Sequence, residues 1–218
     1  MDKIRFLLAS LLLVTVLAAC DEHEKEYIDT RMYVGQIVLD NGRVVNLSDY
    51  DKETMKALGV IYAVDNDGSR FNGRAYAVLL KELTPKQFSD SLDFSLKTST
   101  SMTDYKGFDN TFSMYDSGCS PLAVSVMYRL PYFQSAFIPS LQEMRMMYES
   151  KKVVNPILKE LGGDGFPEDA SECYYWTSTE VANHEGYQAY TYSMSGGQPL
   201  PAVKTMTYPA RPVILLYD

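Results

Sequence analysis

The sequence predicts an α+β domain in which strands precede and follow two or three helices in the middle of the chain. Three observations predict it. Short runs rich in β-branched and aromatic residues occupy residues 32–80. A capping motif at Ser140 indicates the start of a helix. From Tyr174 onward, further β-type runs alternate with gaps that contain glycine, proline or asparagine.

The first strands are predicted as a hairpin. Residues 32–39 and 44–47 are β-type, and residues 40–43, Asp-Asn-Gly-Arg, connect them. Asn-Gly favours the type I′ turn, whose twist fits a hairpin. The elements expected next are a helical turn at 54–58, a strand at 60–64, a polar turn at 65–70 and a strand at 75–80.

An irregular excursion is predicted between these strands and the first long helix. Residues 84–118 are polar and show little periodicity. A helix is then predicted over 121–129. Pro121 occupies its first turn, where a missing N–H costs little, and Pro131 ends it.

A second helix is predicted from the capping box of Ser140 and Glu143 through Tyr148, because the serine hydroxyl and the glutamate can bond each other's backbone N–H. A separate short helix is predicted over 153–161, and the glycine pair 162–163 ends it. The remaining strands are predicted at 174–178, 188–194, 203–207 and 213–217.

The first nineteen residues have the layout of a lipoprotein export signal. Basic Lys3 and Arg5 precede an apolar run over 6–17, which is shorter than the roughly 20 residues that span a bilayer. Residues 17–20, Leu-Ala-Ala-Cys, match a lipobox. This pattern predicts cleavage before Cys20 and lipid on its thiol. An ordinary cleaved signal, with Cys20 free or in a disulfide, is the alternative.

The predicted organisation has four segments. These are a signal peptide (1–19), the lipidated cysteine with an acidic tether (20–30), an N-terminal β-hairpin extension (31–50) and the main domain (51–218). The tether resembles the export signal by which Bacteroidetes-type bacteria send lipoproteins to the outer face of the outer membrane. A plain flexible linker is the alternative. We therefore expect an outer-membrane lipoprotein exposed at the surface, with a periplasm-facing orientation as the alternative.

The composition indicates an acidic protein. The formal net charge is −8, and removal of Asp2, Lys3 and Arg5 with the signal takes away +1 and leaves −9. This charge argues against nucleic acid as a partner. The only histidines are His23 and His184, neither with a ligand at useful spacing, so zinc is not expected. No cofactor is predicted.

Two cysteines remain once Cys20 carries lipid. A disulfide between Cys119 and Cys173 is permitted because the bacterial envelope is oxidising. The sequence does not show whether their Cβ atoms meet, so the free-thiol alternative stays open.

Residues 54–217 carry motifs in a characteristic order. The three most specific are residues 138–144 (Ile-Pro-Ser-Leu-Gln-Glu-Met), 175–180 (Tyr-Trp-Thr-Ser-Thr-Glu) and 210–213 (Ala-Arg-Pro-Val). In this order they resemble the Lcl C-terminal-like domains and the related Fib-succ-major lipoproteins of Bacteroidetes. The chain departs from the family pattern at Ala136-Phe137, Thr177 and Ala210.

The resemblance implies a C-type-lectin-like fold. Such a fold has two helices, a small twisted mixed or antiparallel sheet, adjacent N- and C-terminal strands and long loops that present a surface. Proteins of this class are mostly binding modules, and some are adhesins. The motif residues Ser140, Glu143 and Trp176 are expected to be structural. Glu180 and Arg211 are expected to bond backbone groups or each other, with direct contact to a ligand as the alternative for either residue.

Polar, aromatic-rich loops in the last third of the chain are the predicted ligand surface. Gln198-Pro199 resembles the sugar-binding triplet of calcium-dependent lectins, but Leu200 replaces its carboxylate. The candidate ligand-binding residues are Asn183, His184, Glu185, Tyr187, Tyr192 and Gln198. A weaker prediction places calcium at Asp164, Glu168, Asp169 and Glu172, with solvated loop acids as the alternative.

These features predict a non-enzymatic, lipid-anchored binding module on the cell surface, with a glycan or a protein as its ligand. The first alternative is a structural or accessory subunit of a surface appendage or envelope complex. A formylglycine-generating type of enzyme is a remote alternative, because no histidine accompanies Cys119 and no nucleophile–base constellation stands out.

Overall fold

The computed structural model describes residues 31–71, 73–127, 136–167 and 174–217. The region from Met32 onward forms one unit, and its described residues contain strands and three α-helices. In the first half of the chain the elements are β1 (Ile37–Leu39), β2 (Val44–Val45), the 3-10 turn η1 (Leu47–Asp49), β3 (Ala57–Val64), β4 (Ala75–Leu79), β5 (Leu83–Gln87) and α2 (Gly107–Asp116). The later elements are α3 (Pro121–Met127), α4 (Leu141–Glu160), β6 (Tyr174–Glu180), β7 (Gln188–Ser193), β8 (Pro199–Val203), β9 (Thr207–Ala210) and β10 (Val213–Leu216).

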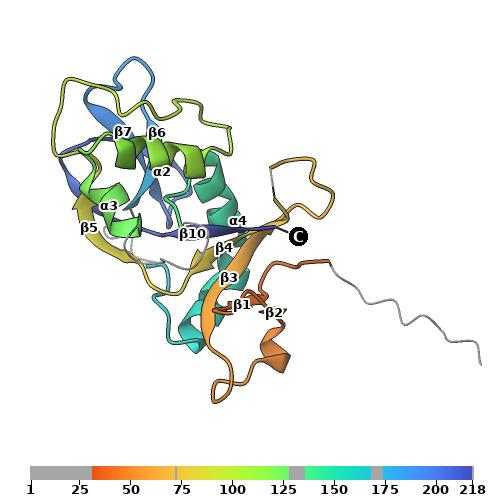
Figure 1. Cartoon of the computed structure of the whole chain (residues 1–218). Helices are drawn as coiled ribbons and strands as arrows, with labels where there is room; N and C mark the ends of the chain where they lie inside the picture. The colour runs from red at the N-terminus through yellow and green to blue at the C-terminus, as the bar shows by residue number, and fades with distance from the viewer. Residues whose placement is uncertain (1–30, 72, 128–135, 168–173, 218) are drawn as a thin grey trace, which may run out of the picture. The chain divides into compact units, whose positions relative to one another are not determined.

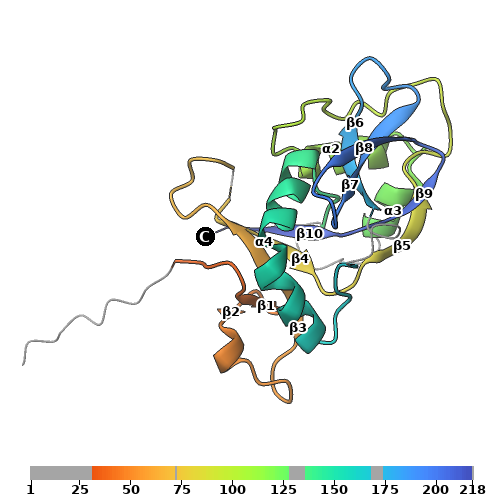
Figure 2. The same cartoon turned by 180° about the vertical axis from the view of Figure 1, so that it is seen from behind.

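The strands form three antiparallel sheets, which confirms the α+β class (Figure 1). The largest has the order β10-β4-β3-β1-β2, and smaller sheets pair β5 with β9 and join β6, β7 and β8. Helices cover the large sheet on both faces. Figure 2 shows α4 lying across one face of it, and α2 and α3 lie towards β5 and β6.

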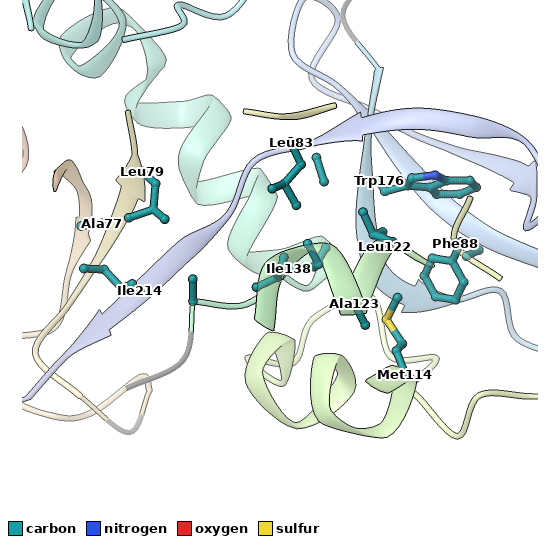
Figure 3. Packing of buried hydrophobic residues seen from close by; sticks show 14 of the residues in the cluster. Ala77, Leu79, Leu83, Phe88, Met114, Leu122, Ala123, Ile138, Trp176 and Ile214 are labelled. Carbon is teal, nitrogen blue, oxygen red and sulfur yellow. The ribbon is translucent and has the colours of Figure 1, made fainter. Parts of the chain in front are cut away.

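Strand β4 explains why both faces are covered. Its side chains alternate between faces, as in any strand. Ala75, Ala77 and Leu79 join a cluster with Trp176 and the residues of α2 and α3 (Figure 3). Tyr76 and Val78 join a second cluster with α4. Because apolar residues point to both faces of the sheet, β4 is an interior strand covered on each face by another layer.

Helix α4 begins at the predicted capping box and runs without a break for 20 residues. The separate helix predicted over 153–161 is therefore wrong. Pro156 lies inside α4 on an exposed side of it, so the ring removes one backbone hydrogen bond without disturbing the packed face. Met144, Met147, Val154 and Leu158 lie on that packed face.

The excursion predicted over 84–118 contains two elements that the sequence did not indicate, β5 and α2. Helix α2 begins at Gly107 without a side-chain cap from Lys106, and glycine, aspartate and asparagine weaken its intrinsic propensity. Tertiary contacts hold its start instead. Among the later strands, the one predicted at 203–207 is a turn between β8 and β9, closed by the N–H of Met206 donating to the carbonyl of Val203.

The N-terminal hairpin forms with the predicted turn but is part of the large sheet. Gly42 adopts a φ of 84°, and β1 pairs with both β2 and β3. The prediction of an extension outside a domain that begins at residue 51 is therefore wrong. The adjacent terminal strands implied by a C-type-lectin-like fold are absent from the described residues too, because β4 separates β10 from β3.

Candidate functional site

The side chain of Glu143 is fully buried where α4, α2 and β4 meet. Its Oε2 accepts the N–H of Ser140 at 2.7 Å, which completes the capping box. Its Oε1 accepts the N–H of Gly107 at 3.2 Å and the hydroxyl of Tyr76 at 3.1 Å. One carboxyl group therefore caps α4, holds the first N–H of α2 and bonds to β4.

Gly107 is required by this arrangement. A Cβ atom at position 107 would lie 2.1 Å from Oε2 of Glu143 and 2.8 Å from the backbone N of Ser140. These separations are far inside van der Waals contact, so only glycine allows α2 to start against the carboxyl group.

The surroundings of Glu143 oppose its ionisation. Burial raises the pKa of Glu143 to about 7, although the hydrogen bonds from Ser140, Gly107 and Tyr76 act in the opposite direction. Burial and the nearby Glu143 raise the pKa of Tyr76 well above its usual value. A carboxyl group that titrates near neutral pH inside a cavity is a feature of functional sites.

A pocket of about 120 Å³ lies over Glu143. Its buried end is formed by Tyr76, Phe137 and Glu143, each no more than 2 % exposed. Its mouth is formed by Phe108 and Tyr217, which are 38 % and 48 % exposed. The other described residues that line it are Tyr105, Asp109 and Leu215.

Aromatic contacts hold the walls of the pocket together. The ring centroids of Phe108 and Phe137 are 5.9 Å apart at an interplanar angle of 84°, and those of Tyr76 and Phe137 are 6.1 Å apart at 71°. Edge-to-face pairs of this kind are favourable. Phe108 also packs against Phe112 at 4.8 Å, one turn further along α2. The pocket thus continues into an aromatic stripe on that helix.

The structure does not bring together the two loops of the ligand surface predicted in the last third of the chain. Residues 183–187 precede β7, whereas residues 194–198 follow it, so the two loops lie at opposite ends of a six-residue strand. That strand separates them by roughly 20 Å. Physical separation by β7 is the reason that Gln198 does not join His184.

Individual residues of that set have local roles. Asn183 adopts a φ of 64°, and its N–H donates to Glu185 at 3.0 Å. The hydroxyl of Tyr187 donates to Asp93 on the loop that follows β5. Tyr192 is buried, and its hydroxyl donates to the carbonyl of Gly197 at 2.9 Å. Tyr192 is therefore a core residue, and its prediction as a ligand contact is wrong.

Of the four acidic residues in the calcium prediction, only Asp164 is among the described residues. Asp164 accepts hydrogen bonds from Lys81 Nζ at 2.9 Å and from the N–H of Glu82 at 3.1 Å. Its carboxylate is thus engaged within the fold. Glu168, Asp169 and Glu172 lie outside the described residues. Across the described ranges, no three His, Cys, Asp or Glu side chains form a group that can hold a metal ion.

The structural motif residues lie in the core, as expected. Trp176 is fully buried between Phe88 and Tyr208, and its Nε1 donates to the carbonyl of Lys86 at 2.9 Å. Arg211 is also buried, with Nη1 donating to the carbonyl of Asp164 at 2.8 Å and its guanidinium 4.7 Å from the ring centre of Phe166.

Glu180 bonds backbone groups and a lysine rather than Arg211. Its carboxylate accepts the N–H of Leu96 at 2.8 Å and that of Thr98 at 3.3 Å, and it forms an ion pair with Lys204. Both side chains of this pair are fully buried. Lys204 was not among the predicted site residues, because a lone lysine in a turn carries no sequence pattern.

The described residues contain one free cysteine, Cys119, which is half-buried. Cys20 and Cys173 lie outside the described residues, so lipidation and the disulfide stay predictions. In the part of the chain that the structure describes, no helix is both long and apolar enough to cross a membrane.

Comparison with solved structures finds a similar fold in another protein. The chain has the fold of a fimbrial protein from Bacteroides ovatus ATCC 8483, with a TM-score of 0.64 and 19 % sequence identity. The match covers 84 % of this chain and 48 % of that protein, so this chain spans about half its length. No family model matches the chain, and no curated protein does.

Proposed function

We propose that this chain is a structural or accessory subunit of a bacterial surface appendage, the first alternative from the sequence. The observation that carries it is the fold shared with a fimbrial protein over most of the chain. Lipid on Cys20 would anchor the subunit to the outer membrane at the cell surface. The proposed role is non-enzymatic.

Exposed aromatic surface supports an assembly role. Phe108 is 38 % and Tyr115 is 41 % exposed on α2, and Phe112 lies between them at helical spacing. Aromatic residues are enriched in the cores of protein–protein interfaces. A contiguous aromatic stripe is therefore more useful to a subunit that contacts other proteins than to a free monomer.

A binding module for a protein ligand is the second candidate, and the pocket over Glu143 favours it. Its volume of about 120 Å³ is well below the roughly 300–1,000 Å³ of most small-molecule sites. A glycan ligand would need a larger concavity than this one. The Lcl-type resemblance fits the same surface location, although the strand order differs from the one that it implies.

The test is the recovery of the chain with surface filaments. Filaments are sheared from cells that produce the chain, purified and probed with an antibody against residues 136–217. We expect the chain in the filament fraction of wild-type cells, and less of it for Cys20→Ser if the lipid holds the appendage base. Proteinase K applied to intact cells should degrade the chain.

Two results would contradict the proposal. One is a chain that is absent from filaments whose number and length do not change when the chain is deleted. The other is full protection of the chain from proteinase K in intact cells.

A further inference from the structure

We propose that the pocket over Glu143 binds the cationic end of a lysine or arginine side chain presented by a protein partner. The inference rests on the proposed function, because the partner would be another component of the appendage. Charge, wall chemistry, size and the surface around the mouth each support it.

The pocket has acidic groups, and its described lining residues include no lysine, arginine or histidine. Asp109 lies at the exposed end and Glu143 at the buried end. Three of the four lone-pair positions of the Glu143 carboxyl group accept hydrogen bonds from Ser140, Gly107 and Tyr76. The fourth position, on Oε2, accepts no hydrogen bond from the described residues.

The walls suit a cation. Tyr76, Tyr105, Phe108, Phe137 and Tyr217 supply five aromatic rings around the space. Ring faces attract ammonium and guanidinium groups, and the attraction grows where water is excluded. Lysine and arginine are the side chains that carry these groups on a long, flexible stem.

The same combination already occurs inside the chain. Lys204 Nζ forms an ion pair with the buried Glu180 and lies 5.7 Å from the ring centre of Phe88. At that site a fully buried glutamate is thus matched by a lysine that lies near one aromatic ring. At Glu143 the glutamate and the rings are present, and the described lining residues provide no lysine.

The size of the pocket points to one side chain. Its volume of about 120 Å³ is well below the roughly 300–1,000 Å³ of most small-molecule sites. This is the scale of the end of a lysine or arginine and is too small for a sugar ring with its substituents. The exposed ring of Phe108 at the mouth, and that of Tyr115 further along α2, then provide apolar surface for the partner's neighbouring residues.

The test measures charge-selective binding to the purified full chain by saturation-transfer NMR. The probe is the capped pentapeptide Leu-Ala-Lys-Ala-Leu, and the matched probe has norleucine in place of lysine. We expect the lysine peptide to bind at least about fivefold more tightly than the norleucine peptide, and an arginine peptide to behave like the lysine peptide.

Two substitutions on α2 serve as a matched pair. Asp109→Asn should weaken binding of the lysine peptide about fivefold, because it removes the exposed carboxylate of the pocket. Asp116→Asn, an exposed aspartate at the other end of the same helix, should not change it. Both positions are on the surface, so neither variant threatens folding.

Three results would overturn the inference: equal binding of the lysine and norleucine peptides, equal binding by wild type and Asp109→Asn, or a lysine peptide that binds no more tightly than n-butylammonium. The last would assign the pocket to a free amine rather than a protein. Filament recovery tests the appendage role separately. A chain without charge-selective binding can still be found in filaments, and a chain absent from filaments can still bind the peptide.

Discussion

The carboxyl group of Glu143 accepts hydrogen bonds from three segments in a place that opposes its ionisation. The donors stabilise the negative form, but burial outweighs them and raises the pKa to about 7. A residue whose only task was to cap α4 would gain nothing from this depth, since capping boxes work at exposed helix ends. Its position at the buried end of a pocket fits a second role, the binding proposed above.

Glu143→Gln should remove a pH dependence from folding. The pKa of this glutamate rises from its ordinary value of 4.5 in the unfolded chain to about 7 in the fold. Between these values the folded state binds more protons, so wild-type stability falls as pH rises. Glutamine resembles the protonated form and does not titrate. We expect the free energy of unfolding of wild type, relative to the variant, to fall by about 3 kcal/mol over this range, measured by urea unfolding at about pH 4.5 and about pH 8.

Ser140→Ala provides the control for that experiment. It removes the serine half of the capping box and should lower stability by about 1 kcal/mol at both pH values. A difference between wild type and Glu143→Gln that stays constant across the two pH values would contradict the assigned titration.

Part of the candidate site was predictable from local sequence. Ser140 and Glu143 form a motif with fixed spacing, and both lie where the motif placed them. The pocket was not predictable, because its walls come from β4, the start of α2, the segment before α4 and the end of β10. Phe108, Phe112 and Tyr115 have helical spacing, and this spacing is the one feature of the sequence that indicates the aromatic surface next to the pocket.

At the scale of elements, the buried pair Glu180–Lys204 holds the long segment between β5 and α2 against β6. Glu180 is on β6, and it bonds Ser95, Leu96 and Thr98 of that segment. Lys204 adds a hydrogen bond to the carbonyl of Phe94 at 3.2 Å. An irregular segment with few apolar residues thus gains its order from charge-assisted hydrogen bonds.

Lys204→Met should destabilise the fold by about 3–5 kcal/mol, because it leaves the Glu180 carboxylate buried without its counter-ion. The double variant Lys204→Met with Glu180→Gln should lose less, since no charge is then buried. Chemical denaturation measures both, and limited proteolysis should show new cleavage within residues 88–106 of the single variant. Two results would contradict this role. One is a Lys204→Met variant as stable as wild type, and the other is a Lys204→Met variant that is more stable than the double variant.

The elements that the sequence predicted well are those whose stability is local. The β1–β2 hairpin has its Asn-Gly turn, and α4 has its capping box. Helix α2 and strand β5 were missed because their stability comes from distant contacts, such as the N–H of Gly107 on Glu143 and the pairing of β5 with β9. The break predicted in α4 was wrong because packing of one helix face outweighed Pro156.

At the scale of the whole molecule, the class was predictable but the order of strands was not. Alternation of apolar residues identifies a strand, but it does not indicate which other strand pairs with it. The partner of β10 is β4, more than a hundred residues earlier in the chain, and β9 pairs with β5 at a similar distance. Such pairings depend on the packing of all layers together, which a segment-by-segment interpretation cannot supply.

Removal of the N-terminal hairpin would test whether it is part of the domain. Ile37 and Leu39 are buried, and they pack in a cluster with Val45 and with Ile157 and Leu161 near the end of α4. Strand β1 also covers one edge of β3, and the N–H of Gly35 just before it donates to the Ile61 carbonyl at 2.8 Å. Its removal would expose both apolar area and a strand edge.

We expect a fragment of residues 51–218 to be several kcal/mol less stable than one of residues 32–218, because each buried aliphatic side chain contributes about 1.5–3 kcal/mol. The exposed edge of β3 should also make the shorter fragment aggregate. Thermal unfolding followed by circular dichroism, with light scattering in parallel, measures both effects. Equal midpoints and equal solubility would contradict a stabilising role for the hairpin in the large sheet.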